Sequence, residues 1–285
     1  MFTRVEFPSG RRVMEFLAAQ QSVVSRPVLS EYKAVRVGSQ AVREWVATDS
    51  EDLVAYLQIV EHGPRSYAIE VVCQDDRYVV VPQLLSAATA DLDGSVQVWA
   101  RTAPMMAAVE NSGGVLERTL LEMQTKLPIP TSVLMPTGFS IRPFDTSRHS
   151  EALRRVNNRA FEGHREAGGL TAKALQKMFS LPWFREGDVI VAWMNEKLAG
   201  FCWTKCENAG VGEIYIVCVD PGFASRGLGR ALVVSGFAHL HDTYGVSIGS
   251  LWTDAGNRAA VELYKSLGLV TSSENHAYGL ELVAT

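Results

Sequence analysis

The sequence predicts an α/β protein built from two similar halves, in each of which strands alternate with helices. Three observations lead to this prediction. The chain has 285 residues, and domains commonly run to about 100–200 residues, so its length suits two domains. A short apolar segment recurs at matching positions of the two halves, and a proline-rich stretch lies between the two copies.

The recurring segments are one strand and one helix in each half. Residues 69–75 read IEVVCQD and residues 214–220 read IYIVCVD, so four of the seven positions are identical. Both segments are apolar and rich in β-branched residues, which is typical of a buried strand. The tetrapeptide AAVE occurs at residues 107–110 and again at 259–262, each time after a strand-like stretch that contains tryptophan. We therefore expect each half to run strand, helix, strand, helix, strand.

A proline-rich segment separates the two halves. Residues 127–138 read LPIPTSVLMPTG, with three prolines and a closing glycine. Proline supplies no N–H donor and restricts the residue before it, so this segment suits neither a helix nor a central strand. We expect an N-terminal domain over residues 1–126, a linker over 127–138 and a C-terminal domain over 139–285.

The composition limits the class of protein. The 27 basic and 31 acidic residues give a net charge of −4, which offers no basic face for nucleic acid. The apolar runs are far shorter than a bilayer requires, and the N-terminus lacks the apolar core of a signal peptide. We expect a cytoplasmic monomer with no membrane partner and no metal. Reduced thiols are expected at the four cysteines, which are Cys73, Cys202, Cys206 and Cys218.

The two halves differ directly after the repeated strand. Residues 220–230 read DPGFASRGLGR and precede an apolar helix. A glycine-rich turn between a strand and a helix presents backbone N–H groups to phosphate oxygens, and Gly227 and Gly229 leave the main chain open to them. Glycine also serves simply to cap turns. The same place in the N-terminal half, residues 76–83, reads DRYVVVPQ, so we expect no phosphate cradle there.

The glycine-rich loop and the later segment NRAAVELYKSLG resemble the GCN5-related N-acetyltransferase superfamily. In that family an R/Q-x-x-G-x-G/A loop binds the pyrophosphate of coenzyme A. Here residues 224–229 read ASRGLG, so Ala224 replaces the usual Gln or Arg, a change that removes one side chain but no backbone donor. The resemblance implies two tandem domains, each with a mixed, mostly antiparallel sheet flanked by helices, and acetyl-CoA as co-substrate without a metal.

The resemblance also implies which residues contact the coenzyme. The acetyl-CoA arm is expected to pair with the main chain of Val217, Cys218 and Val219, as if it added a strand. Asn257 is expected either to contact the coenzyme or to serve as a plain N-cap of the next helix, and both roles are compatible. The pyrophosphate is expected to meet the loop residues Ala224, Ser225, Arg226, Gly227, Leu228, Gly229 and Arg230.

Longer stretches of the C-terminal half resemble the mycothiol synthase family of tandem acetyltransferases. The resemblance covers nearly all of residues 139–285 and is thin over residues 1–126. It implies that acetyl-CoA acetylates the cysteinyl amine of desacetylmycothiol, a cysteinyl-glucosaminyl-inositol, in the last step of mycothiol biosynthesis. The matching stretches are RVNNRAF at 155–161, GHREAGG at 163–169, PWF at 182–184, GFCWTK at 200–205 and GEIY at 212–215.

Two side chains are candidates for the acid–base chemistry. An amine attacks a thioester only when neutral, and an α-amino group has a pKa of about 8, so a carboxylate must take its proton. The resemblance places the family's base at Glu213, although a solvated glutamate at a strand end is the plain alternative. The family's acid maps onto Tyr264, whose phenol can donate to the leaving thiolate; packing on the sheet is the alternative. After residues 107–110 the N-terminal half continues NSGG and offers no such tyrosine.

The resemblance assigns the sugar substrate to charged and aromatic side chains. Polyols are held by groups that offer several hydrogen bonds in fixed positions. The family's contacting tyrosine aligns with Trp252, whose indole N–H can donate but which lacks the phenol hydroxyl. The expected substrate contacts are Glu31, Glu166, Lys205, Glu213 and Trp252.

Two other functions stay open from the sequence. One is acetyl transfer to another small amine or to a protein amine, against which the set of Glu166, Lys205 and Glu213 argues. The other is an acetyl-CoA-binding sensor without turnover, against which the presence of both Glu213 and Tyr264 argues. The N-terminal half is expected to be a degenerate acetyltransferase-like domain that closes one side of the sugar pocket.

Overall fold

The computed structural model describes residues 2–5, 10–23, 29, 37, 42–130, 134–163, 168–208 and 210–282. The chain divides into two compact units: unit 1 comprises Met1–Leu120 with Glu274–Thr285, and unit 2 comprises Leu121–Ser273. None of the helices in the described ranges is long and apolar enough to cross a membrane. Within the same ranges, no group of three or more His, Cys, Asp or Glu side chains could hold a metal ion.

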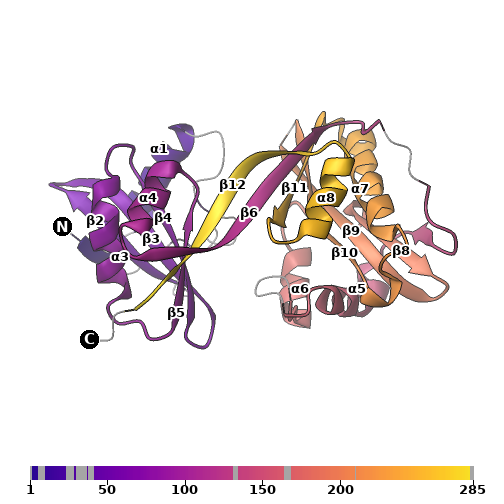
Figure 1. The fold of residues 1–285 in the computed structure, drawn as a ribbon, viewed down its shortest axis with the longest axis horizontal. Helices are drawn as coiled ribbons and strands as arrows, with labels where there is room; N and C mark the ends of the chain where they lie inside the picture. The colour runs from indigo at the N-terminus through magenta and orange to yellow at the C-terminus, as the bar shows by residue number, and fades with distance from the viewer. Residues whose placement is uncertain are drawn as a thin grey trace. The chain divides into compact units, whose positions relative to one another are not determined.

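Unit 1 contains a mixed sheet with the strand order β1-β2-β3-β4-β5-β12 (Figure 1). Neighbours from β1 to β4 are antiparallel, β4 and β5 are parallel, and the end of β12 runs antiparallel to β5. Helix α1 packs on one face, and α3 and α4 pack on the other. The elements are β1 (Phe2–Val5), α1 (Gly10–Val23), β2 (Arg43–Asp49), β3 (Asp52–Gly63), β4 (Ser66–Cys73), η1 (Tyr78–Val80), α3 (Val81–Thr89), β5 (Ser95–Ala100), α4 (Ala103–Glu110) and β12 (Val270–Leu280).

Unit 2 contains a second mixed sheet with the strand order β6-β11-β10-β9-β8-β7. Strands β10 and β11 are parallel neighbours, and the neighbours from β7 to β10 are antiparallel. The elements are β6 (Gly114–Lys126), β7 (Ser140–Arg142), α5 (Thr146–Ala160), α6 (Ala172–Phe179), η2 (Glu186–Asp188), β8 (Val189–Met194), β9 (Lys197–Asn208), β10 (Val211–Val219), η3 (Pro221–Phe223), α7 (Leu228–Tyr244), β11 (Ile248–Asp254) and α8 (Arg258–Ser266).

Two apolar layers enclose the sheet of unit 2. Side chains alternate along a strand, so Cys202 of β9 packs in the cluster beneath α7 and α8, while Phe201 and Trp203 pack in the cluster beneath α5 and α6. Figure 1 shows these two pairs of helices on opposite sides of the strands. We call the two sides the α7 face and the α5 face. All three side chains are fully buried.

Both halves follow the predicted order of elements. The N-terminal copy runs β4, α3, β5, α4, β6, and the C-terminal copy runs β10, α7, β11, α8, β12. The parallel registers also correspond, with Ile69 opposite Val98 and Ile214 opposite Leu251. The strand, helix, strand, helix, strand prediction is therefore confirmed in each copy.

The last strand of each copy contributes to the other unit. β6 follows α4 of the N-terminal copy, yet its second half neighbours β11 in unit 2, where Met123 is fully buried. β12 follows α8 of the C-terminal copy, yet Tyr278 lies opposite Val98 of β5 in the core of unit 1. The Tyr278 hydroxyl donates to Glu110 at 3.0 Å. Each compact unit therefore depends on a strand from the other copy of the repeat.

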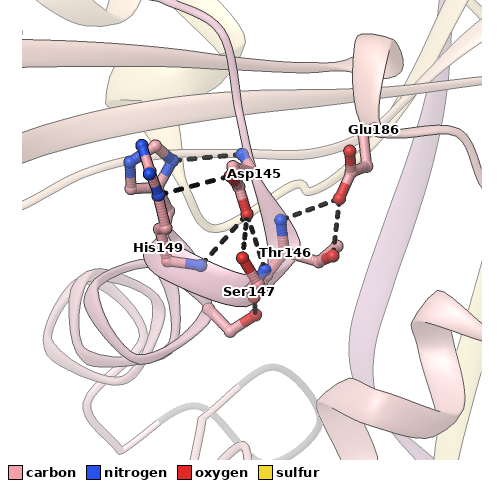
Figure 2. A network of polar contacts seen from close by, with 7 residues as sticks. Asp145, Thr146, Ser147, His149 and Glu186 are labelled. Atoms are coloured by element: carbon pink, nitrogen blue, oxygen red, sulfur yellow. Dashed lines mark hydrogen bonds and ion pairs between the residues drawn. The ribbon is translucent and has the colours of Figure 1, made fainter.

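Helix α5 begins at a polar network that joins it to η2 (Figure 2). The Asp145 carboxylate accepts from the N–H groups of Ser147 at 2.8 Å and Arg148 at 3.1 Å, which satisfies two donors of the first turn. Glu186 of η2 accepts from the N–H of Thr146 at 2.8 Å. The Ser147 hydroxyl also donates to Asp145 and lowers the pKa of that carboxyl, and the Thr146 hydroxyl likewise donates to Glu186 and lowers its pKa. These contacts fix α5 over its face of the sheet.

Candidate functional site

The sheet of unit 2 opens at the middle of β10. The parallel register with β11 extends from Val211 opposite Ile248 to Ile214 opposite Leu251, whereas β9 remains paired with β10 as far as Val219. Among the described residues, no strand pairs with the other edge of residues 215–219. An extended chain with amide groups can add to such an edge through main-chain hydrogen bonds. The predicted coenzyme contacts at residues 217–219 fall on this edge.

A β-bulge lies at the point where the two strands part. Ile214 lies opposite Thr204 and Ile216 lies opposite Trp203, so Tyr215 is the extra residue on β10. A bulge redirects the side chains that follow it. As a result, Tyr215 and Ile216 both pack toward the α5 face, while Ile214 packs on the α7 face.

The glycine-rich loop carries two residues with left-handed backbone. Ser225 has φ 59°, and Gly227, the N-cap of α7, has φ 80°. Left-handed residues within a turn direct successive N–H groups into a concave anion site. Gly227 has no side chain that could cap α7. The first-turn N–H groups, which form the positive end of the helix dipole, therefore receive no side-chain cap from it. This geometry suits a phosphate group.

Of the two loop glycines, Gly227 but not Gly229 has a backbone conformation that requires glycine. A Cβ at Gly227 would meet its nearest atom, Pro136 Cγ, at 3.7 Å, which is an ordinary contact. Its positive φ, rather than lack of space, therefore requires glycine there. Gly229 has no such backbone requirement, and a Cβ there would meet Val219 at 3.8 Å.

Asp220 secures the start of the loop. Its Oδ1 accepts from the N–H of Gly222 at 2.8 Å, and its Oδ2 lies 3.2 Å from Nε of Arg159. Further along, the Arg230 guanidinium donates to Ser266 of α8 at 2.6 Å, and the Arg226 guanidinium lies 5.8 Å from the Phe223 ring centroid. The loop is thus fixed at its base and carries two arginines beside the helix N-terminus.

The candidate base lies directly across from a lysine. Glu213 of β10 is in register with Lys205 of β9 and with Ser250 of β11. Residues directly opposite each other share one face of the sheet, which here is the α5 face because the Lys205 ammonium lies over the ring of Trp183. Glu213 is half-buried, whereas only 9% of Lys205 is exposed. The structure therefore brings these two predicted residues together beside the open edge.

The candidate acid packs on the other face of the sheet. Tyr264 of α8 is 7% exposed and belongs to the cluster of the α7 face. Burial raises the pKa of Tyr264 to about 12, with a smaller contribution from Cys202. Its hydroxyl makes no hydrogen bond with any residue that the structure describes. Because Glu213 and Tyr264 lie on opposite faces, groups from both can meet only where β10 and β11 separate.

The remaining predicted residues fall into three groups. Trp252 is 38% exposed, directly follows the last residue of β11 in register with β10, and shares a face with Ser250 by strand alternation. Asn257 caps α8, since its Oδ1 accepts from the N–H of Ala260 at 3.2 Å. Glu31 and Glu166 lie outside the described residues.

Sequence reasoning missed the partners of Lys205. Trp183, which the sequence indicates only within the matching stretch 182–184, has its ring centroid 4.9 Å from Nζ of Lys205, and the Tyr215 ring lies at 5.8 Å. Glu207 Oε2 lies 2.6 Å from the same Nζ. The pattern along β9 could have indicated Glu207, which follows Lys205 by two residues. Nothing in the sequence pattern connects Trp183 to Lys205.

Comparisons with known proteins bear on the fold and the family. The model of the acetyltransferase (GNAT) family matches residues 151–269. Among solved structures, a GCN5-related N-acetyltransferase from Sphaerobacter thermophilus superposes with a TM-score of 0.73 at 19% identity, covering 98% of this chain and 95% of that one. A tandem GNAT protein from the clavulanic acid biosynthesis pathway gives 0.75 at 12% identity, covering 100% and 99%. These likenesses confirm the predicted fold of tandem acetyltransferase domains.

Curated relatives identify a more specific family within the GNAT acetyltransferases. A mycothiol acetyltransferase of Thermomonospora curvata is 39% identical over 190 residues, 65% of this chain and 63% of that protein. That of Streptomyces scabiei is 33% identical over 85% of this chain and 81% of its own length, and that of Nocardia farcinica 30% over 96% and 95%. The chain therefore belongs to the mycothiol acetyltransferase family of GNAT acetyltransferases.

Proposed function

We propose that this acetyl-CoA-dependent N-acetyltransferase acetylates the cysteinyl amine of desacetylmycothiol and releases mycothiol and coenzyme A. The observation that carries the proposal is the register of Glu213 with Lys205 beside the open edge of β10. It puts a proton acceptor and a cation on one face, at the point where an acetyl thioester along that edge would end. The names of the family's curated relatives support the choice of acceptor.

The coenzyme follows β10 and the glycine-rich loop in this proposal. Its amide-bearing arm pairs with the main chain of Val217, Cys218 and Val219. Its pyrophosphate accepts from the loop N–H groups of residues 224–230, and Asn257 remains the cap of α8 beside it. Supporting observations are the open edge of the strand and the left-handed backbone at Ser225 and Gly227. The chain supplies binding and orientation here, while the thioester itself supplies the activated acetyl group.

Glu213 acts as the base. The substrate amine has a pKa of about 8 and enters largely protonated, so the carboxylate takes one proton, directly or through a water molecule. The neutral nitrogen then attacks the acetyl carbonyl. An N–C bond forms and the C–S bond breaks, so the electron pair leaves on sulfur as the thiolate of coenzyme A.

Tyr264 stabilises the leaving thiolate. With its pKa raised to about 12, the phenol stays protonated at neutral pH and has an O–H to donate. Full proton transfer to a thiolate whose thiol has a pKa of about 8.5 is uphill. We therefore assign to Tyr264 a hydrogen bond to sulfur, while the proton that finally neutralises the thiolate comes from the amine.

The acceptor's sugar and inositol rings lie on the α5 face in this proposal. Lys205 and the half-exposed Trp252 provide contacts from β9 and β11. The family resemblance implies Glu31 and Glu166 as further substrate contacts. Residues 1–126 act as a degenerate, non-catalytic copy of the repeat and residues 139–285 as the catalytic copy, with residues 127–138 between them, while the last strand of each copy packs in the other compact unit. The protein works as a cytoplasmic monomer on a small-molecule substrate.

The test is to incubate the protein with acetyl-CoA and desacetylmycothiol and to follow both thiol release and product mass. We expect one acetyl group per acceptor, with an equal amount of coenzyme A. Acetylation of glucosamine or a lysine peptide, but not of desacetylmycothiol, would support a different acceptor. Binding of acetyl-CoA without turnover of any amine would support the sensor alternative.

A further inference from the structure

We propose that Trp183 and Tyr215 form an aromatic seat that positions the Lys205 ammonium beside Glu213 and thereby sets affinity for the polyol acceptor. The inference rests on the proposed function, because it concerns how the same acceptor is held. Trp183 acts through Lys205, so it is a positioning residue rather than a catalytic one.

The two rings meet the ammonium in cation–π geometry. The Lys205 Nζ lies 4.9 Å from the Trp183 ring centroid and 5.8 Å from that of Tyr215, both within the roughly 6 Å over which such contacts are favourable. The two rings also contact each other edge-on, with centroids 4.9 Å apart and planes at 71°. Each ring therefore fixes the orientation of the other.

The seat is held rigidly from behind. Trp183 is 6% exposed, and the fully buried Trp203 lies behind it with ring centroids 6.1 Å apart. Trp203 also lies 5.8 Å from the Tyr215 ring and 5.4 Å from that of Phe184. The bulge places Tyr215 on this face, so three separate segments, the loop before η2, β9 and β10, converge on one ammonium.

The Glu207 carboxylate beside the Lys205 ammonium differs from the two rings in how far it is exposed. Glu207 Oε2 lies 2.6 Å from Nζ, but its side chain is 46% exposed. The Lys205 side chain, by contrast, is only 10% exposed, so of the two partners the carboxylate is the one that solvent or a substrate hydroxyl can reach and replace. The rings are more firmly held, because Trp183 is buried in the core and Tyr215 packs partly buried against it. The seat thus keeps the ammonium on the acceptor face while a sugar hydroxyl replaces the Glu207 carboxylate beside it.

The test is a double-mutant cycle on the full chain with acetyl-CoA and desacetylmycothiol. Trp183→Leu should raise the KM for desacetylmycothiol about tenfold, with little change in kcat or in the KM for acetyl-CoA. When Lys205→Met is already present, adding Trp183→Leu should change that KM by less than about twofold. Equal effects in both backgrounds would mean that Trp183 is only structural, and would overturn the proposal.

Trp193 provides a matched control. It is a buried tryptophan of the same cluster, 7% exposed, but its ring lies 5.5 Å from the Arg142 guanidinium instead. Trp193→Leu should leave the KM for desacetylmycothiol unchanged. If it raises that KM as much as Trp183→Leu does, the effect belongs to general loosening of the core and the proposal is wrong.

A second measurement needs no acceptor and no large substitution. In the wild-type protein labelled with ¹³C-lysine, the ring currents of the seat should shift one lysine Cε–H resonance upfield. That resonance should be absent in Lys205→Arg and should move in Trp183→Phe, a milder change if Trp183→Leu does not fold. Absence of any such shifted resonance would overturn the seat. A shifted resonance without acetylation of desacetylmycothiol would instead contradict the proposed function alone.

Discussion

At the scale of single residues, the proposed chemistry depends on two groups that pack on opposite faces of one sheet. Glu213 is half-buried on the α5 face, whereas Tyr264 is nearly enclosed on the α7 face. The sequence and its family resemblance predicted both residues. They could not predict that burial would give Tyr264 a pKa of about 12, because that shift comes from packing with residues such as Cys202, far away in the chain.

Glu213→Gln should lower kcat by roughly 10²–10⁴ near pH 7, because the amide keeps the shape but cannot take a proton. The loss should be partly recovered at higher pH, where the amine is already neutral. The measurement is kcat against pH with saturating substrates. Glu207→Gln is the matched control on the same face and should keep kcat within a few-fold. A near-normal rate for Glu213→Gln at pH 7 would refute its role as base.

Tyr264→Phe removes only a hydroxyl. A hydrogen bond to a charged group contributes about 1.5–3 kcal/mol, so kcat should fall roughly 10–150-fold while the affinity for acetyl-CoA stays the same. Because the pKa of Tyr264 is about 12, the wild-type rate should show no loss from tyrosine ionisation around pH 10. Steady-state kinetics together with calorimetry of acetyl-CoA binding measure both effects. An unchanged kcat would leave Tyr264 as a packing residue only.

At the scale of elements, the loop before α7 and the separation of β10 from β11 form the proposed coenzyme path. The glycine pattern was visible in the sequence, and so was the strand before it. The bulge at Tyr215 and the end of the β11 register at Ile214 were not, because strand pairing depends on partners distant in sequence. Consequently the open edge, which gives the predicted contacts at Val217–Val219 their physical basis, emerged only from the structure.

Gly227→Ala tests whether the loop conformation is needed for binding. A side chain at φ 80° is strained by about 1–2 kcal/mol, and relaxing that strain turns the loop N–H groups away. We expect acetyl-CoA affinity to fall about tenfold by calorimetry. Gly245→Ala is the matched control, since it caps the other end of α7 at φ 67° with open space around it. The Gly245→Ala variant should lose a similar amount of stability but keep its affinity for acetyl-CoA. Equal losses of affinity in the two variants would contradict a role of the loop in binding acetyl-CoA.

At the scale of the whole molecule, the sequence repeat and the compact units divide the chain differently. The repeat indicated two copies, and the observed order of elements agrees with it. The exchange of last strands was beyond prediction, because residues 270–280 read VTSSENHAYGL, a mixed pattern that does not specify which sheet it joins. Tyr278 is buried in unit 1 and Met123 in unit 2, so neither half of the repeat contains its complete core.

Removal of residues 274–285 tests this exchange. The truncation deletes Ala277 and Tyr278, which are at most 1% exposed, and Tyr278 lies in the core of unit 1. In sequence, however, the deleted segment is the end of the C-terminal copy of the repeat. Loss of a buried aromatic alone costs about 3–5 kcal/mol, so unit 1 should lose its protection from hydrogen exchange while α7 and β10 keep theirs. Loss of protection confined to unit 2 would contradict the exchange.

The most direct test of the account is to locate the acetyl group on the product. Desacetylmycothiol offers both an amine and a thiol, and the proposed base beside the open edge of β10 activates the amine. After reaction with acetyl-CoA, fragmentation mass spectrometry should place one acetyl group on the cysteinyl nitrogen, with the cysteinyl thiol free and one coenzyme A released per product. An acetyl group on sulfur, or coenzyme A release without any acetylated acceptor, would contradict the account.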